Sequence, residues 1–301
     1  MSSSPATTVP VPERTRDGLR VFAWLSFLAE VTIIATGGAV RLTGSGLGCP
    51  TWPTCTPESL VPTEDLGWHS AVEFGNRMMS GVVGILALMV LLLVVRRRRD
   101  RRDLFALAAI VLGGVVAQAI VGGITVWTGL NPFIVGFHYV SSLVLVCVCT
   151  AFLVRLDAPV GPRTLAVPRG YAIATHVTSL VLTVTIAFGV LTTGAGPHSG
   201  DADAGRNGFD ASLWQHVHAW PGYALLALTL VLVVIARARR LPVQRWITVL
   251  LLLQFAQIAV GLYQARNGLP ELAVGVHMVL AALTAAAMTV TVLHLKAPRA
   301  V

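Results

Sequence analysis

The sequence predicts an all-α integral membrane protein of eight transmembrane helices, arranged as two four-helix bundles in parallel tandem repeat. Three observations lead to this fold class: long apolar stretches, basic residues in every second loop, and an internal repeat at a constant offset. Of the 301 residues, 55% are hydrophobic and 12% are charged, whereas a soluble domain carries about 25% charged residues. The composition therefore argues against an ordinary soluble protein.

The apolar stretches are long enough to cross a bilayer, for which a helix needs about 20 mainly apolar residues. The expected spans are 19–41, 68–95, 104–127, 132–155, 169–194, 213–236, 242–263 and 271–294. The first stretch is too long for the apolar part of a signal peptide, and no small-residue cleavage site follows it. We therefore expect it to remain as the first span.

The net charge of +8 is concentrated in alternate loops. The basic loops hold Arg14, Arg16, Arg20, Arg96 to Arg99, Arg101, Arg102, Arg155, Arg163, Arg169, Arg237, Arg239, Arg240, Arg245, Lys296 and Arg299. The positive-inside rule then predicts a multi-pass protein of the cell membrane with both termini in the cytoplasm. This placement explains the charge as a topology signal, so nucleic acid is not an expected partner, while contact with anionic membrane lipid is open.

The two halves of the chain repeat each other at an offset of 139 residues. Gln118-Ala-Ile-Val-Gly122 corresponds to Gln257-Ile-Ala-Val-Gly261, and Gly136-Phe-His138 corresponds to Gly275-Val-His277. An even number of spans in each half makes both halves enter from the same side, which predicts a parallel repeat. The expected organisation is an N-terminal segment 1–18, a first half 19–155, a linker 156–168, a second half 169–294 and a tail 295–301.

Histidines inside the spans are the first candidates for a functional site, because ionisable groups there are rare and usually functional. His138 and His277 occupy the same repeat position, and His216 and His218 lie at a similar depth in the sixth span. The latter two are two residues apart and point to different helix faces. Aligning Glu73-x-x-Asn76 with Gln215-x-x-His218 selects His218 as the partner of His277.

Two imidazoles on facing helices are the usual axial ligands by which a helical bundle holds haem iron. A zinc site would need three or four ligands together, and no such set is visible in the sequence. Two polar histidines that only pack between helices are the alternative. The second half is thus expected to hold a haem between His218 and His277.

The first half offers a different set, in which His138 is accompanied by Glu73, Asn76 and Arg77. Residues three or four apart share a helix face, and a carboxylate inside a span is costly unless it is paired or performs chemistry. An ion pair between Glu73 and Arg77 with no further role is one interpretation. The other is a substrate pocket, because this half keeps one histidine and an acid where the second half keeps two histidines.

Cys49 and Cys55 lie in the loop after the first span, on the side where an oxidising compartment permits a disulfide. The short separation and the two intervening prolines suit a small closed loop, and two unpaired thiols are the alternative. Cys147 and Cys149 lie within a span and are interpreted as packing residues.

The chain resembles the haem A synthase family over nearly its whole length. The segment Gly37-Gly-Ala-Val-Arg41-Leu-Thr-Gly-Ser-Gly46-Leu-Gly-Cys49-Pro-Thr-Trp-Pro-Thr-Cys55 is similar to that family's first outside loop, including its cysteine pair. Glu73-Phe-Gly-Asn76-Arg77 resembles the family's glutamate–histidine–arginine motif, and Thr193-Gly-Ala-Gly-Pro-His198-Ser-Gly-Asp201 resembles its loop after the fifth span.

The resemblance implies a reaction and a division of labour between the halves. Haem A synthases oxidise the C8 methyl of haem O to a formyl group by successive oxidations, which supplies haem A to cytochrome oxidases. The family pattern implies haem b as cofactor on His218 and His277, haem O as substrate beside His138, and Glu73 as the catalytic acid. Glu73 would either stabilise positive charge that develops on the substrate or move a proton, and the sequence leaves both roles open. It also implies a haem O synthase and cytochrome oxidase assembly factors as partners, and a homo-oligomer is left open.

Asn76 departs from the family pattern, which has a histidine at this position. Asn is a poor ligand for haem iron, so we expect a five-coordinate substrate haem on His138, with weak contact from Asn76 or substitution by His69 as the alternatives. The rival functions are a di-haem b-type cytochrome exchanging electrons with quinone and a transporter. A di-haem cytochrome would usually stack its haems across the membrane, whereas the candidate histidines here lie at a similar depth. A transporter would need a polar path that the third and seventh spans scarcely offer.

Overall fold

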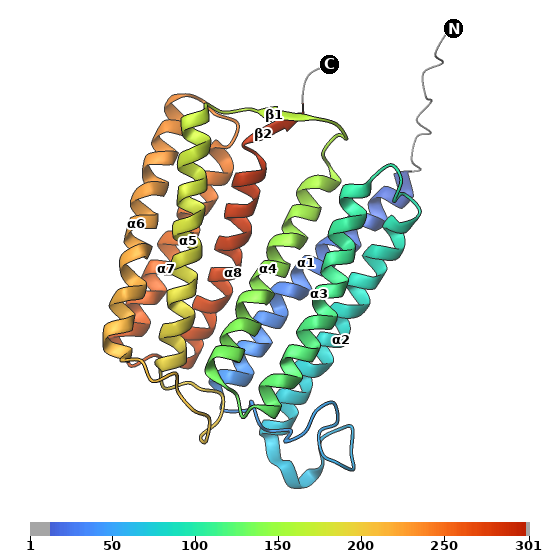
Figure 1. Cartoon of the computed structure of the whole chain (residues 1–301), viewed down its shortest axis with the longest axis vertical. Helices are drawn as coiled ribbons and strands as arrows, with labels where there is room; N and C mark the ends of the chain where they lie inside the picture. The colour runs from blue at the N-terminus through green and yellow to red at the C-terminus, as the bar shows by residue number, and fades with distance from the viewer. Residues whose placement is uncertain (1–12, 299–301) are drawn as a thin grey trace.

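The computed structural model describes residues 13–298, and it is almost entirely helical. Figure 1 shows long helices that run side by side between two ends of the molecule. They are α1 (Glu13–Leu42), α2 (Gly67–Val95), α3 (Arg102–Trp127), α4 (Pro132–Leu156), α5 (Arg169–Ala195), α6 (Ala211–Ala238), α7 (Gln244–Arg266) and α8 (Glu271–Leu293). All eight contain a stretch long and apolar enough to cross a membrane, as the sequence predicts.

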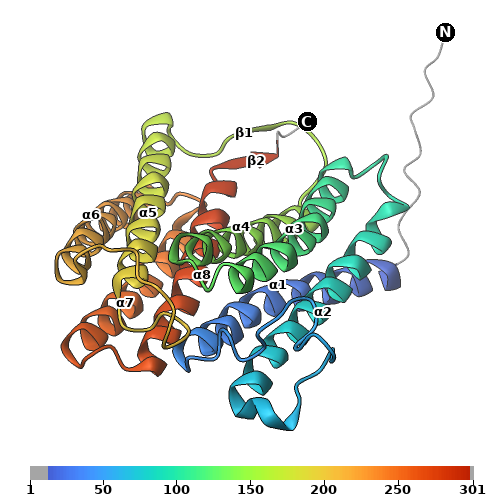
Figure 2. The ribbon, with the colours of Figure 1, turned by 60° about the horizontal axis from the view of Figure 1, so that its bottom comes forward.

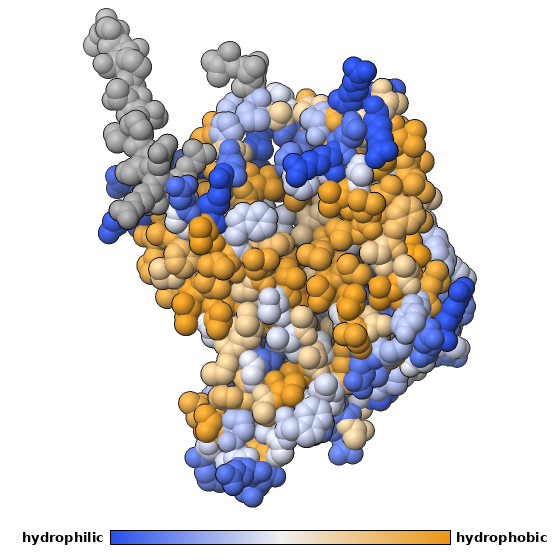
Figure 3. Space-filling view, turned by 180° about the vertical axis from the view of Figure 1, so that it is seen from behind, coloured by the Kyte–Doolittle hydropathy of each residue, from blue (hydrophilic) through white to orange (hydrophobic). Residues whose placement is uncertain are grey.

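The surface supports this interpretation. Figure 3 shows an apolar band around the middle of the visible face, with hydrophilic residues gathered at its two ends. Large apolar side chains of the spans are exposed, among them Ile85 on α2, Leu180 on α5 and Val234 on α6. An apolar belt of this extent is far larger than the patches that soluble monomers expose. The chain is therefore a multi-pass membrane protein.

The ends of the bundle differ in charge and need separate names. We call the end with the arginine-containing loops 96–101, 157–168 and 239–243 the basic end, and it lies at the top of Figure 1. We call the opposite end the disulfide end. It carries the loop between α1 and α2 (residues 43–63), which we call the disulfide loop, and the loop 196–210 between α5 and α6.

The helices form two groups of four, which Figure 2 shows side by side. Within the first group α1 packs against α2 and α4, and α3 packs against α2 and α4; the second group repeats these contacts among α5 to α8. The groups meet where α4 and α8 pack together, with α1 on α8 and α4 on α5. The Tyr139 hydroxyl donates a 3.0 Å hydrogen bond to the Met278 carbonyl across this contact. These two residues are themselves repeat equivalents, 139 positions apart, and a two-fold relation between the halves would bring such residues together. The parallel tandem repeat and its domain boundaries stay predictions.

Local signals set several helix ends near the later site. Asn131 caps α4 through hydrogen bonds from the backbone N–H groups of Phe133 and Ile134, and Pro132 occupies the first turn. Asp210 caps α6 in the same way. Hydrogen bonds from the Ser212 side chain and from nearby backbone N–H groups hold the pKa of the Asp210 carboxyl below its ordinary value.

The structure also contains a small sheet that an all-α prediction does not include. β1 (Arg163–Leu165) in the linker pairs antiparallel with β2 (Lys296–Pro298) in the tail. The pairing is continued by a backbone hydrogen bond from Ala166 to Leu295, and Leu295 is buried. Strands of three residues carry too little periodic pattern to be recognised in a sequence.

Candidate functional site

His218 on α6 and His277 on α8 face each other in the second half, as the alignment of the halves predicts. Their ring centroids are 6.2 Å apart. A metal–imidazole bond is about 2.0–2.1 Å, so two axial imidazoles on one iron have ring centres roughly 6 Å apart. The two rings therefore stand at the separation that a single haem iron between them requires.

The hydrogen bonding of His218 leaves the correct nitrogen free for a metal. Its Nδ1 lies 2.9 Å from the Thr185 carbonyl oxygen on α5. A carbonyl only accepts, so Nδ1 carries the proton and Nε2 presents its lone pair. A backbone carbonyl bound to the second ring nitrogen is the usual support for a metal-binding histidine. His277 differs, because its Nδ1 is buried without a hydrogen-bond partner.

Glycines on neighbouring helices make room for these rings. A methyl group at Gly189 would lie 2.8 Å from Cε1 of His218, and one at Gly261 would lie 3.2 Å from Cε1 of His277. In the first half a methyl group at Gly122 would lie 3.6 Å from Cε1 of His138. Gly122 and Gly261 are repeat equivalents, so a glycine faces the equivalent histidine in each half, His138 in the first and His277 in the second.

The other two histidines considered as iron ligands have different surroundings. His216 is exposed and its Nδ1 donates to the Ser212 carbonyl of its own helix. His69, considered as a substitute ligand, lies at the disulfide end with Nδ1 2.9 Å from the Ser45 hydroxyl and its ring stacked on Trp68. Within the described residues 13–298 there is no group of three or more His, Cys, Asp or Glu that could hold a metal ion by itself. A haem iron needs only two protein ligands here, so the paired histidines fit this group.

The first half holds one histidine and an amide at the corresponding depth. His138 on α4 is half-buried, and its Nδ1 has no hydrogen-bond partner. Asn76 on α2 accepts a 2.7 Å hydrogen bond from the Thr36 hydroxyl on α1 and packs beside Gly37. We use the name N-terminal pocket for the expected substrate site at His138, Asn76 and Gly37. This hydrogen bond ties Asn76 to α1, and the part that Asn76 takes in holding a substrate haem stays a prediction.

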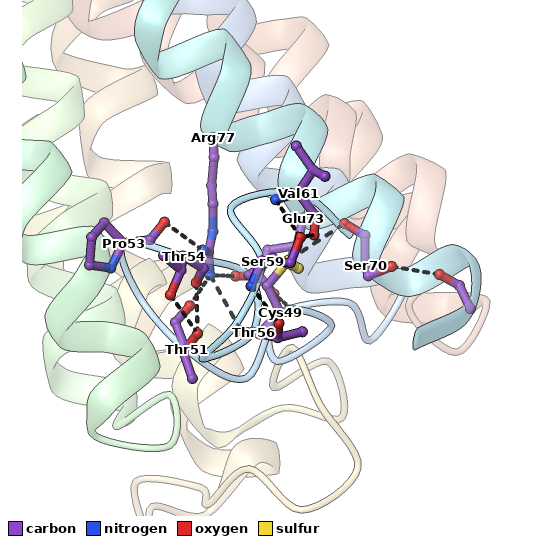
Figure 4. Close-up of a disulfide and its surroundings, with 12 residues drawn as sticks. Cys49, Thr51, Pro53, Thr54, Thr56, Ser59, Val61, Ser70, Glu73 and Arg77 are labelled. Atoms are coloured by element: carbon purple, nitrogen blue, oxygen red, sulfur yellow. Dashed lines mark hydrogen bonds and ion pairs between the residues drawn. A yellow bond between two sulfur atoms is a disulfide. The ribbon is translucent and has the colours of Figure 1, made fainter. Parts of the chain in front are cut away.

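Glu73 and Arg77 form the ion pair that their spacing predicts, with Arg77 Nη2 2.6 Å from Glu73 Oε1. The other carboxylate oxygen accepts a 2.7 Å hydrogen bond from the backbone N–H of Cys49. Arg77 also donates to the carbonyls of Thr51 and Thr54, at 2.9 and 3.1 Å. Figure 4 shows this side chain reaching from α2 into the disulfide loop. The pair therefore fixes the loop against α2, a role that the spacing alone does not reveal.

The disulfide between Cys49 and Cys55 is present, and both sulfur-bearing residues are fully buried. The loop that it closes fits tightly on the helices. A methyl group at Gly48 would lie 2.6 Å from the backbone carbonyl of His69, and Trp52 lies over Gly123 of α3 with its ring against Trp127. The loop therefore covers the disulfide end of the first bundle as a fixed cap.

The cap is also joined to the second half. The Gly46 N–H donates a 2.7 Å hydrogen bond to the Gly200 carbonyl, and Arg41 donates to the carbonyls of His198 and Thr193. The two sequence motifs after the first and fifth spans are thus in direct contact. This contact joins the two halves of the chain at the disulfide end.

The fold and the site define a multi-pass membrane protein with a paired-histidine site in one bundle and a histidine–carboxylate region in the other. The sequence profile of the cytochrome oxidase assembly protein family matches residues 20–73 and 69–198. This match covers more than half of the chain, so the chain belongs to that family, the family of the haem A synthases.

Curated relatives agree with this assignment. The chain is 30% identical to the haem A synthase of Listeria welshimeri over 139 residues, which is 46% of this chain and 44% of that protein. It is 31% identical to the haem A synthase of Bacillus cereus over 153 residues, which is 48% of this chain and 49% of that protein. The matched region thus spans about half the length of these relatives. His218 and His277 lie beyond the residues that the family profile matches, so their assignment depends on their geometry.

Proposed function

We propose that this protein is a haem A synthase that oxidises the C8 methyl group of haem O to a formyl group in the N-terminal pocket. A haem b held by His218 and His277 is the resident cofactor, and His138 is the protein ligand to the substrate iron. The observation that carries the proposal is the facing histidine pair, 6.2 Å apart, in a member of this family. Haem b in this position supplies a one-electron carrier for the oxidation.

The chain's own residues hold the two haems at a defined depth. Thr185 fixes the proton of His218 on Nδ1, so its Nε2 can bind iron without a change of tautomer. Gly189 and Gly261 leave space for the rings of the pair, and Gly122 leaves space for His138. With His138 as its one histidine ligand, the N-terminal pocket would leave one axial position of the substrate iron open.

Glu73 suits an electrostatic role in this pocket. Both of its oxygens already accept hydrogen bonds, from Arg77 and from the Cys49 N–H. Moving a proton would require one of these bonds to break, whereas a fixed negative charge beside developing positive charge requires no rearrangement. We therefore propose that Glu73 stabilises positive charge that develops on the substrate, and that Arg77 and the disulfide loop position the carboxylate.

The surroundings of the protein follow from the same proposal. Both termini are proposed to lie in the cytoplasm, with the disulfide end on the oxidising side of the cell membrane. Haem O would arrive from the enzyme that makes it, and haem A would pass to cytochrome oxidase assembly factors. Self-association of the chain is a further open proposal.

Haem extraction tests the function directly. The protein is expressed in a host that makes haem O, purified, and its haems are separated by chromatography. Wild type is expected to yield haem A and haem b, His277→Ala to lose haem b, and the matched control His216→Ala to keep it. Haem b without any consumption of haem O would favour the electron-carrying cytochrome, and a protein without haem would favour the transporter.

A further inference from the structure

A carboxyl group in the middle of α1 has no counterpart in the family motifs considered above. Glu30 is 2% exposed, and its Oε1 has no hydrogen-bond partner. Among the described residues, no salt bridge or hydrogen bond involves its side chain. An ionised carboxylate without a partner is very costly in an apolar interior, and acids within spans usually mark a proton or ion pathway.

Among the side chains that the structure describes, no basic group lies close enough to Glu30 to balance its charge. α1 packs against α2, α4 and α8, and the titratable side chain beside Glu30 on these helices is the Cys149 thiol of α4. The other titratable or charged groups of these three helices lie nearer the two ends or further along α4: His69, Glu73, Arg77, His138, Tyr139, Cys147, Arg155, Glu271 and His277. Glu30 is therefore expected to carry its own proton.

A small cavity lies one turn from Glu30, on the side toward the basic end. It occupies about 10 Å³ in the centre of the first bundle, and its wall includes Ser26, Cys149 and Phe152. A volume of about 10–15 Å³ is the least that accepts a water molecule. Ser26 and Glu30 are four residues apart and share a helix face. The Ser26 hydroxyl and the Cys149 thiol in the wall thus offer hydrogen-bonding groups to a water molecule or a proton on its way to Glu30.

The same helix face leads from Glu30 to the N-terminal pocket. Gly37 lies seven residues further along α1, about 10 Å at the helical rise, and packs beside Asn76. The second half offers an internal comparison. Gly189 packs against His218 as Gly37 packs beside Asn76. Leu182 lies seven residues before Gly189 and is buried in an apolar core. The first half therefore has an acid seven residues before the glycine of the proposed substrate site. The second half has a leucine seven residues before the glycine of the proposed haem b site.

We propose that Glu30 is a proton-exchanging site that compensates changes of charge in the N-terminal pocket. When a one-electron oxidant removes an electron from haem bound there, the O–H bond of the Glu30 carboxylic acid breaks. The carboxylate remains and the proton leaves toward the basic end past Ser26; reduction reverses both changes. The inference rests on the proposed function, because it requires a haem in this pocket.

Infrared difference spectroscopy tests the proposal on the purified protein loaded with haem b and haem O. The sample is reduced with dithionite and oxidised with ferricyanide, after its haem content has been measured. Wild type is expected to lose a carboxylic-acid carbonyl band on oxidation, and Glu30→Gln to lack this band. Glu271→Gln is the matched control, because this acid lies in the first turn of α8, and it should keep the band. Glu30→Leu copies the second half and serves as a second variant if the amide destabilises the protein.

Two outcomes separate this inference from the function on which it rests. With both haems bound, an unchanged band pattern in wild type and Glu30→Gln overturns the proton site and leaves the synthase intact. If no haem enters the N-terminal pocket, the proposed function fails. Exchange of the Glu30 proton is then measured on the protein that holds haem b alone, after its transfer to deuterated water. A Glu30 carbonyl that shifts in wild type, and shifts more slowly in Ser26→Ala, then supports proton exchange with the basic end. A Glu30 carbonyl that never shifts contradicts it.

Discussion

Replacing Gly189 by alanine should weaken haem b binding although it improves the helix. The new methyl group would lie 2.8 Å from Cε1 and 3.1 Å from Nδ1 of His218, so the ring must move. The ring is also fixed by its hydrogen bond to Thr185, 2.9 Å long. Overpacking of this kind costs about 1–3 kcal/mol, which corresponds to a loss of affinity of roughly 5- to 150-fold.

The matched control is Gly113→Ala on α3. Gly113 has open space where its Cβ would lie, so the change should add only the helix preference for alanine, about 1 kcal/mol or less. The assay is the ratio of haem b to protein after purification, together with the thermal unfolding temperature of each variant. Gly189→Ala should lose haem without a comparable loss of helix content.

The result that would refute the reasoning is a Gly189→Ala protein with the wild-type haem ratio and absorption spectrum. Such a protein would show that the ring of His218 is free to shift, or that it is no ligand. A loss of haem in Gly113→Ala of the same size would show that the effect is a general response to changed helix packing.

Three further changes test the cap at the disulfide end. Gly48→Ala should detach the disulfide loop, because the methyl group meets α2 backbone at 2.6 Å; faster proteolysis of the loop would show it, and wild-type resistance would contradict it. The double change Cys49→Ser and Cys55→Ser opens a loop with a sequence separation of 6 and should cost about 2 kcal/mol, seen as a lower unfolding temperature. Arg77→Lys should abolish haem A formation while haem b is kept, since an ammonium cannot reach the same set of carbonyls at once; full activity would show that the carboxylate needs no such positioning.

The sequence predicts the spans well because the physical requirement is simple: about 20 apolar residues must cross the hydrocarbon core. The histidine pair is predictable for a related reason. A repeat fixes which residues stand at the same depth, and the two-residue spacing of His216 and His218 forces a choice between them. In the structure His218 faces His277, and His216 is exposed.

The contacts of the disulfide loop could not be predicted in this way. The contacts of Gly48 with α2 and of Trp52 with Gly123 on α3 depend on how an irregular loop folds back on these two helices, and no periodic pattern records this. The ion pair of Glu73 and Arg77 follows from a spacing of four, but the carbonyl groups that Arg77 also binds come from the loop.

Glu30 is a residue that the sequence could have revealed. It is an isolated acid within an apolar span, which is itself a signal of function. Only the structure shows that the side chain is buried beside a cavity and lacks a partner.

The most direct test of the account is the conversion of haem O by the purified protein. Protein that carries haem b is supplied with haem O and a one-electron acceptor, and the haems are followed by chromatography over time. The account predicts that haem O is replaced by haem A in wild type, and that Glu73→Gln keeps haem b but leaves haem O unchanged. Haem O that stays unchanged in wild type, with haem b intact and haem O bound, would contradict the assignment of this protein as a haem A synthase.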